Sequence, residues 1–303
     1  MISDRFNNDH IYEAIEETLA THEISIRKIC KIAGVSVSAY YNWKSNSTKL
    51  TKNEKFNKKL MKNINELYES HNKTLGYRRI TMFLERDYGT KVNQKRVYRL
   101  MKKMKIQSVI RRKRPSYIKS TPQITAENIL ARNFNASGVN QKWLTDVTEF
   151  KYGSGQKAYL SAILDLGDRS IIAWVLKKNN NNALVFQTLD QAVEKHPDAT
   201  PIFHSDRGFQ YTHAGFKAKL ENVGMTQSMS RVGRCIDNGP MEGFWGILKA
   251  EMYYLKKNFE TFEALKKAIA DFIIYYNTKR YQKNLGNLAP LEYRKLLEKQ
   301  TAS

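Results

Sequence analysis

Three acidic residues have the type and spacing needed for metal-dependent chemistry on phosphate esters. Asp146 lies in the segment TDVTEF, Asp206 follows the short apolar segment PIFHS, and Glu242 follows DNGPM. Carboxylates brought together repel one another, and hard divalent cations such as Mg²⁺ relieve that repulsion. Two ions about 3.5–4 Å apart can activate an attacking oxygen and stabilise a leaving one in a phosphodiester displacement. We therefore expect two Mg²⁺ ions at these three acids, and Mn²⁺ would fit the same oxygen ligands.

Each acid taken singly has a more ordinary explanation. Asp146 fits the edge of a strand, Asp206 fits a turn before Gly208, and Glu242 fits the first turn of a helix, where an acid is favoured. Chemistry requires that the fold bring all three together.

The elements around the acids predict an α/β fold. Strands are expected at 142–153, 157–166, 170–178, 201–206 and 225–230, with helices at 182–196, 213–224 and 241–255. This order predicts a mixed five-stranded sheet flanked by helices, its first three strands antiparallel and the later ones parallel. Asp206 then lies at the carboxyl end of the fourth strand, where α/β sites form. Asp146 reaches the same place if the first strand is central.

The preceding half of the chain is predicted to be all-α and to bind DNA. Residues 24–44 and 75–105 each have the form helix, glycine turn, helix, with Ser36 or Ser38 and then Asn93 as helix caps. In a helix-turn-helix the second helix enters the major groove, although ordinary helical hairpins with solvated basic faces give the same pattern. The expected DNA contacts are Tyr40, Lys44, Arg78, Arg79, Lys95, Arg96 and Arg99.

The charge of the chain favours a polyanionic partner. The 303 residues include 51 Lys and Arg against 29 Asp and Glu, a net charge of +22. Residues 1–120 hold 27 of these bases and only 11 of the acids. Such an excess is typical of nucleic-acid binding, although ribosomal or membrane-surface proteins share it. Two distant cysteines support neither a disulfide framework nor a zinc site. The polar N-terminus and the lack of a long apolar run predict a cytoplasmic, nucleoid-associated protein without a membrane partner.

Longer motifs then connect the acids to a known family. Asp206 and Glu242 are separated by 35 residues, within HSDRGFQY and DNGPMEGFWGILKAE. Together with GYRRI, VNQKRVYRLMKK, NQKWLTDVTEF and YYNTKRYQKNLGNLAPLEYR, this pattern resembles the DDE transposases and retroviral integrases. It most closely resembles the second-reading-frame product (OrfB) of the IS-three insertion-sequence family, over nearly the whole chain. Departures are small: Gly243 stands where serine is frequent, and Gly138-Val139 where a proline is frequent.

The resemblance implies a ribonuclease-H-like core with Asp146, Asp206 and Glu242 as catalytic acids. Lys249, two helical turns after Glu242, takes the family's role of contacting the transposon end; the alternative is a solvated lysine. Arg231 and Arg234 contact phosphate or are merely solvated. We expect His204 to have a packing or supporting role, Trp143, Trp174 and Trp245 to pack in the core, and Asp165, Asp168 and Asp237 to have no catalytic role.

The predicted organisation has five parts. A helix-turn-helix region (1–48), a second such region (49–110) and a basic linker (111–135) precede the catalytic core (136–280) and a C-terminal tail with a helix (281–303). The predicted function is a DNA transposase that binds its terminal inverted repeats and cleaves and joins strands as a homo-oligomer on double-stranded DNA. The resemblance also implies fusion to an upstream reading-frame product. The alternatives are a non-catalytic DNA-binding regulator of transposition and a nuclease that hydrolyses without joining.

Overall fold

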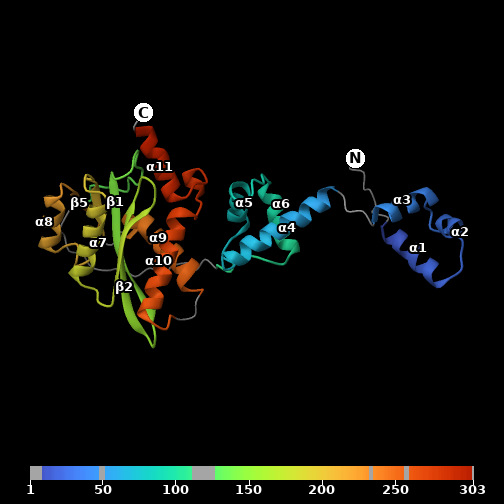
Figure 1. Cartoon of the computed structure of the whole chain (residues 1–303), viewed down its shortest axis with the longest axis horizontal. Helices are drawn as coiled ribbons and strands as arrows, with labels where there is room; N and C mark the ends of the chain where they lie inside the picture. Colours follow the sequence, from blue (N-terminus) through green and yellow to red (C-terminus); the bar gives the residue numbers. More distant parts are fainter. Residues whose placement is uncertain (1–8, 48–51, 111–126, 232–234, 256–258, 302–303) are drawn as a thin grey trace.

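The computed structural model describes residues 9–47, 52–110, 127–231, 235–255 and 259–301 (Figure 1). Its second half is built on a five-stranded mixed sheet with strand order β3-β2-β1-β4-β5. β1 (Lys142–Tyr152), β2 (Gln156–Asp165) and β3 (Ile171–Lys177) form an antiparallel meander. β4 (Ile202–Ser205) runs parallel to β1, and β5 (Thr226–Met229) parallel to β4. The predicted sheet, with β1 at its centre, is confirmed.

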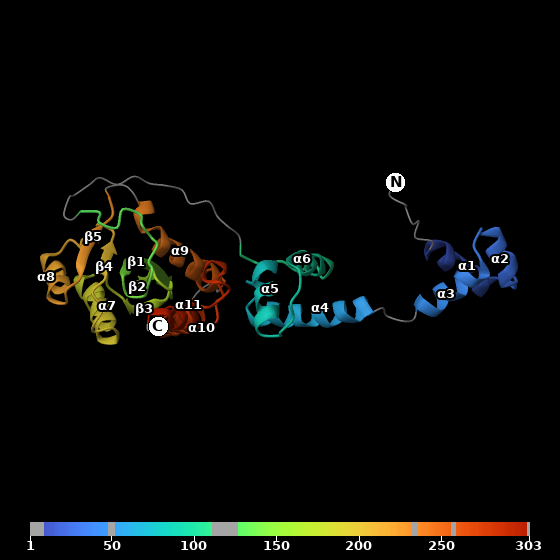
Figure 2. The ribbon, with the colours of Figure 1, turned by 90° about the horizontal axis from the view of Figure 1, so that it is seen from above.

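Helices cover both faces of this sheet (Figure 2). α7 (Asn182–Lys195) and α8 (Ala214–Asn222) lie on one face, and α9 (Gly239–Leu248), α10 (Phe262–Thr278) and α11 (Pro290–Thr301) on the other. Consecutive strand residues point to opposite faces. Trp143 accordingly joins the core under α7 and α8, whereas Leu144 joins the core under α9 and α10. The central strand is thus held between two apolar layers.

The helix that carries Glu242 differs from the prediction. The sequence predicts one α-helix over 241–255, but α9 begins at Gly239 and gives way to a π-helical turn at Lys249–Tyr253. Glu251, in this turn, accepts hydrogen bonds from Arg79 at 3.1 Å and from Arg280 at 2.8 Å and 3.0 Å. A π turn changes which side chains face the core. The two distant arginines explain why Glu251 is turned inward, and they are not visible in the local pattern.

In the N-terminal unit, a hairpin of two helices packs against a third helix. α1 (Asp9–Thr21), α2 (Ile26–Ile32) and α3 (Val37–Ser47) enclose their own apolar cluster. Gly34 makes the turn with a φ of 68°, a conformation that favours glycine. The hydroxyl of Ser36 accepts a hydrogen bond from the Ala39 amide at 3.0 Å, so the cap is Ser36 and not Ser38.

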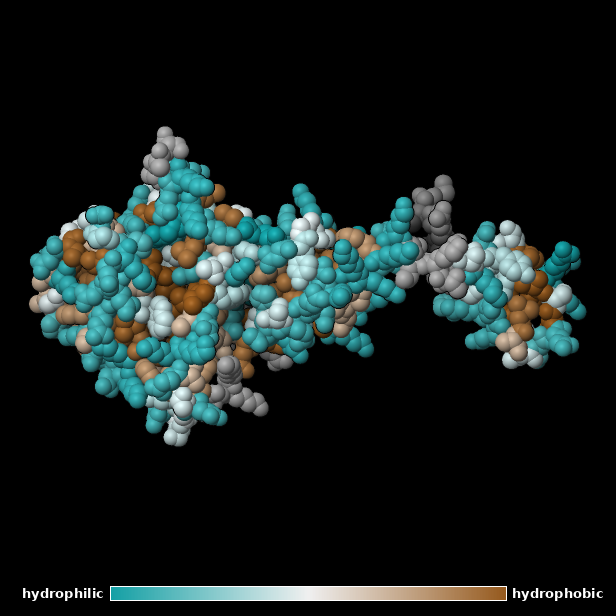
Figure 3. All heavy atoms as spheres, in the orientation of Figure 1, coloured by the Kyte–Doolittle hydropathy of each residue, from teal (hydrophilic) through white to brown (hydrophobic). Residues whose placement is uncertain are grey.

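The second helical unit packs against the sheet domain. α4 (Lys52–Ser70), α5 (Tyr77–Arg86) and α6 (Gln94–Lys103) share an apolar cluster with Tyr281 and Ala289, which follow α10. Asn93 caps α6 as predicted, accepting a hydrogen bond from the Lys95 amide at 2.8 Å. On the face shown in Figure 3, the surface over these helices is mainly hydrophilic. None of the helices in the described ranges is both long and apolar enough to span a bilayer.

Candidate catalytic site

Asp146 lies on β1, and Asp206 directly follows β4, the parallel strand next to β1. The last paired residues of β1 and β4 are Leu144 and His204, so each aspartate lies two residues further along its own strand direction. β4 ends at Ser205, which places Asp206 in the loop at the carboxyl end of the strand, as predicted. Its Oδ1 accepts a hydrogen bond from the Gly208 amide at 2.9 Å, which orients the carboxylate at the start of that loop.

The surroundings of these two acids disfavour their charged forms. Burial raises the pKa of Asp146 to about 7, and the nearby Asp206 and, to a lesser extent, Glu242 add to the rise. Burial also raises the pKa of Asp206. A divalent cation would relieve both the desolvation and the mutual repulsion. The donor set of two half-buried, mutually repelling carboxylates therefore fits a hard cation.

Glu242 lies in the first turn of α9 and is exposed. It acts electrostatically on Asp146, yet no group of three His, Cys, Asp or Glu in the described ranges is close enough to hold a metal ion. The start of its helix is fixed to β1 by Asn238, whose side-chain amide donates to the Thr145 carbonyl at 3.0 Å. The structure thus brings two predicted acids together and leaves the third nearby. Asn238 was not predicted, although it stands in the DNGPME motif.

Two further residues near the acids make contacts that the sequence analysis did not predict. Trp245 is buried in the core, as expected, but its indole Nε1 also donates to Asp146 Oδ2 at 3.0 Å. Tyr211 is buried, with its hydroxyl 3.2 Å from Thr145 Oγ1. Burial raises the pKa of Tyr211 well above its usual value, and Asp146 and Asp206 contribute. Neither contact has a signal in local sequence, because each joins residues at least 66 positions apart.

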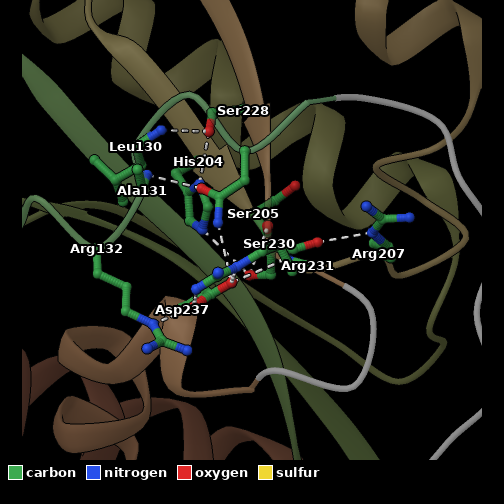
Figure 4. A network of polar contacts seen from close by, with 11 residues as sticks. Leu130, Ala131, Arg132, His204, Ser205, Arg207, Ser228, Ser230, Arg231 and Asp237 are labelled. Atoms are coloured by element: carbon green, nitrogen blue, oxygen red, sulfur yellow. Dashed lines mark hydrogen bonds and ion pairs between the residues drawn. The ribbon is translucent and has the colours of Figure 1, made fainter.

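His204 has the supporting role that we predicted. Its ring is fully buried, with Nδ1 2.9 Å from Ser228 Oγ and Nε2 3.2 Å from Ser230 Oγ (Figure 4). Burial lowers its pKa to about 4, so the ring is neutral at physiological pH. Both nitrogens are engaged with β5 and the residue just after it, which leaves His204 holding the sheet together beside Asp206.

Lys249 follows Glu242 by two turns and lies over the central strand. It is half-buried, with its ammonium 5.4 Å from the ring centroid of Phe150. Burial lowers its pKa, while Asp146 and Glu149 oppose that shift. The positive charge therefore lies within electrostatic reach of Asp146, and its contact with DNA stays a prediction.

Arg231, predicted as a phosphate contact, forms an ion pair in the structure. Its guanidinium donates to both carboxylate oxygens of Asp237, at 3.0 Å and 3.1 Å, and Arg132 donates to the same carboxylate at 2.6 Å (Figure 4). Burial would raise the pKa of Asp237, but these donors hold it below its usual range. Arg231 is thus paired with Asp237, but its side chain stays half exposed, and its contact with phosphate remains a prediction. Arg234 lies outside the described residues.

The residues predicted to contact DNA through the first helical unit divide into two kinds. Tyr40 is fully buried and its hydroxyl donates to Glu16, so the prediction for Tyr40 is wrong because the ring fills the core. Lys44 forms an ion pair with Glu16 at 2.7 Å, but its side chain stays half exposed. A DNA contact by Lys44 remains a prediction.

The second unit shows the same division. Arg79 is mostly buried and pairs with Glu251, and Arg96 donates to Asn57 at 2.9 Å. The prediction for Arg79 is wrong, because this guanidinium joins α5 to the core. Arg78, Lys95 and Arg99 are exposed, the last two on α6. These three remain the predicted DNA contacts of this unit, with Arg96 half-buried beside them.

Comparisons with known proteins agree with this architecture. Two models described as an integrase core domain match residues 136–235 and 242–296, and an HTH-like domain matches residues 55–114. The putative transposase InsK of insertion sequence element IS150 from Escherichia coli is 39% identical over 256 residues, covering 84% of this chain and 88% of that protein. The transposase InsF of insertion sequence IS3A, from the same species, is 29% identical, covering 89% of this chain and 94% of that protein.

Solved structures show a weaker likeness. The catalytic core domain of HTLV-2 integrase, in complex with magnesium, is 18% identical with a TM-score of 0.42, covering 52% of this chain and 97% of that one. The sheet, its helices and the sequence matches define a protein with an integrase core and an HTH-like domain. The chain belongs to the IS-three family of insertion-sequence transposases. The family prediction made from the sequence is confirmed.

Proposed function

We propose that this transposase cleaves and joins DNA strands with two Mg²⁺ ions held by Asp146, Asp206 and Glu242. The bound ions would supply an activated oxygen nucleophile and stabilisation of the leaving oxygen. The substrate is double-stranded DNA at the terminal inverted repeats of its own element. Water first cuts one strand to expose a 3′-OH, and that hydroxyl then attacks a second phosphodiester. One P–O bond forms and one breaks in each step.

The observation that carries this proposal is the lack of an ion-pair partner for the two core acids. Asp237, Glu251 and the pair Asp165 and Asp168 each bond to at least one arginine. In the described ranges Asp146 and Asp206 form no ion pair within 4.0 Å and accept hydrogen bonds from neutral N–H groups. Buried charges are normally paired with one another or bound to metals. A cation from outside the chain is the partner that this pair lacks.

The roles of the chain's own residues follow from their places. Burial around Asp146 keeps water from solvating the carboxylates, which strengthens their attraction for a cation. Glu242 completes the ligand set from α9, whose start Asn238 ties to β1. Lys249 provides a positive charge for a phosphate next to the reacting one. The exposed bases Arg78, Lys95 and Arg99 bind the DNA backbone at a distance from the site.

Holding two DNA ends requires more than one active site, so we infer a homo-oligomer on DNA. Fusion to an upstream reading-frame product and a place at the nucleoid in the cytoplasm stay predictions from the sequence. The part of the chain preceding the core has the positive charge that such DNA binding needs.

The test uses labelled duplexes from the terminal repeats that flank the reading frame, incubated with the full chain and Mg²⁺. Asp206→Asn should abolish nicked and joined products. Asp198→Asn removes an exposed acid before β4 and serves as the matched control, which should leave them unchanged. Equal products from the wild type and Asp206→Asn would contradict the proposal. Binding by the wild type without cleavage would favour a regulator, and nicking without joining would favour a nuclease.

A further inference from the structure

Trp245 joins the helix of one predicted metal ligand to the strand of another. It lies three residues after Glu242 on α9 and is 6% exposed, with its ring 5.1 Å from that of Phe244. Its indole Nε1 donates to Asp146 Oδ2 at 3.0 Å. Packing alone would be satisfied by any large apolar ring, so the hydrogen bond is the feature to be explained.

The bond restricts the carboxylate on which it acts. The Asp146 side chain has two torsions, of which the second is broad and weakly restrained in aspartate. The Val147 amide donates to Oδ1 at 2.8 Å and the indole donates to Oδ2, so both oxygens are fixed by rigid donors. Each oxygen has two acceptor positions, and one neutral donor on each leaves the other for a cation. The carboxylate is thus oriented without being neutralised.

We propose that Trp245 is a positioning residue that presents Asp146 to the cation and sets the spacing between Asp146 and the helix of Glu242. This inference rests on the proposed metal site. Hydrogen bonds to the ligands of a metal orient them, and losing one typically costs about 10–100-fold in metal affinity. The same hydrogen bond connects α9 to β1 at a point one helical turn from Glu242. Its loss would therefore make the positions of both Asp146 and Glu242 less fixed.

Trp143 provides a matched control on the same sheet. It is fully buried on β1, facing the opposite layer, and its Nε1 has no hydrogen-bond partner among the described residues. Replacing either tryptophan by phenylalanine removes a comparable buried volume and one indole N–H. Only Trp245→Phe removes a hydrogen bond to Asp146.

The experiment measures Mg²⁺ dependence in two ways, by the rise of the thermal unfolding midpoint and by strand joining, using the full chain. Trp245→Phe should need about 10–100-fold more Mg²⁺ for half of the maximal effect in both assays. Trp143→Phe should keep the wild-type Mg²⁺ dependence. An unchanged dependence in Trp245→Phe, or equal shifts in both variants, would overturn the inference and leave Trp245 as a packing residue.

A measurement on the wild type covers the case in which a variant fails to fold. The chain has four tryptophans, so its indole N–H groups give four resonances in a ¹H–¹⁵N spectrum. Mg²⁺ should shift the Trp245 indole resonance and leave that of Trp143 in place. A Trp245 resonance that stays still while Mg²⁺ raises the melting midpoint overturns this inference alone. A wild type that responds to Mg²⁺ in none of these assays overturns the proposed metal site with it.

Discussion

Two pairs of aspartates in the same domain are treated in opposite ways by the rest of the fold. Asp165 and Asp168, at the end of β2 and in the turn after it, are fully buried and share Arg294 from α11, at 2.8 Å and 2.5 Å. Asp146 and Asp206 are less buried and accept hydrogen bonds from neutral donors. Burial raises the pKa of Asp165 to about 6 and that of Asp146 to about 7.

The difference separates an acid pair that holds the fold together from one that is kept for a cation. Arg294, on α11, pairs with both Asp165 and Asp168 and so connects α11 to the end of β2. The charge of the first pair is therefore compensated within the protein. The second pair is stabilised only in part, which is tolerable if its partner arrives from solution. Sites that bind and react commonly carry such a cost in stability.

Among the substitutions that test this comparison, Arg294→Met is expected to have the largest effect on stability. Removing one partner of a buried ion pair typically costs about 3–5 kcal/mol, because the remaining charges stay buried without compensation. Denaturant unfolding should show that loss of stability. Lys295→Met, at the exposed neighbouring position, should change stability little. Equal stability of the two variants would mean that Arg294 is not the partner that completes Asp165 and Asp168.

Smaller changes of the melting midpoint are expected when one aspartate of each pair is replaced by asparagine. The two changes should have opposite signs. Asp168→Asn removes a charge that Arg294 needs and should lower the melting midpoint. Asp206→Asn, without divalent cations, removes repulsion, keeps an oxygen that accepts from the Gly208 amide, and should raise it. A change of about 1 kcal/mol corresponds to roughly 2–4 °C for a domain of this size. Melting curves in EDTA decide the sign, and lowering by both substitutions would remove the distinction between the pairs.

The effect of Asp146→Asn on stability should depend on pH. The folded-state pKa of Asp146 is raised to about 7, above its value in the unfolded chain. The contribution of Asp146 to the stability of the wild type therefore falls as the pH rises from about 4, and the fall levels off above about 7. The midpoint of Asp146→Asn should therefore rise relative to that of the wild type over that window and then stay at a constant difference from it. A difference that does not change with pH would contradict the raised pKa.

Local sequence could predict the order of elements but not the distant pairings. The alternating pattern of 142–153 and the apolar run before Asp206 placed both acids correctly, because strand period and position follow from neighbouring residues. Tyr40 and Arg79 were misjudged for another reason. Their partners Glu16 and Glu251 lie 24 and 172 positions away, so nothing in their own helices shows that they are buried or paired.

The site illustrates the same limit. Trp245 was expected to pack in the core, and it does, but its hydrogen bond to Asp146 crosses 99 positions. Glu251, in the π turn after α9, likewise accepts hydrogen bonds from Arg79 and Arg280, which lie 172 and 29 positions away. Composition and motif spacing therefore indicate which residues take part, whereas which of them are tied to one another is decided by tertiary structure.

The smallest effect is expected on DNA binding, when an ion-paired arginine and an exposed arginine of the second helical unit are replaced in turn. If Arg99 contacts a phosphate, Arg99→Ala should weaken DNA binding and reduce the slope of log affinity against log salt by about 1. Arg79→Met should leave that slope unchanged, because its charge is already matched by Glu251. Binding curves at several salt concentrations measure both. A reduced slope for Arg79→Met and not for Arg99→Ala would reverse the assignment.

The central claim is that Asp146 and Asp206 are completed by a divalent cation, and Mg²⁺ titration of the thermal unfolding midpoint tests it most directly. A ligand that binds the folded state at 100 times its Kd adds about 2.7 kcal/mol of stability. Mg²⁺ should raise the midpoints of the wild type and of Asp198→Asn, and leave that of Asp206→Asn where it is. An equal rise in Asp206→Asn would contradict the claim, because the cation would then be binding elsewhere.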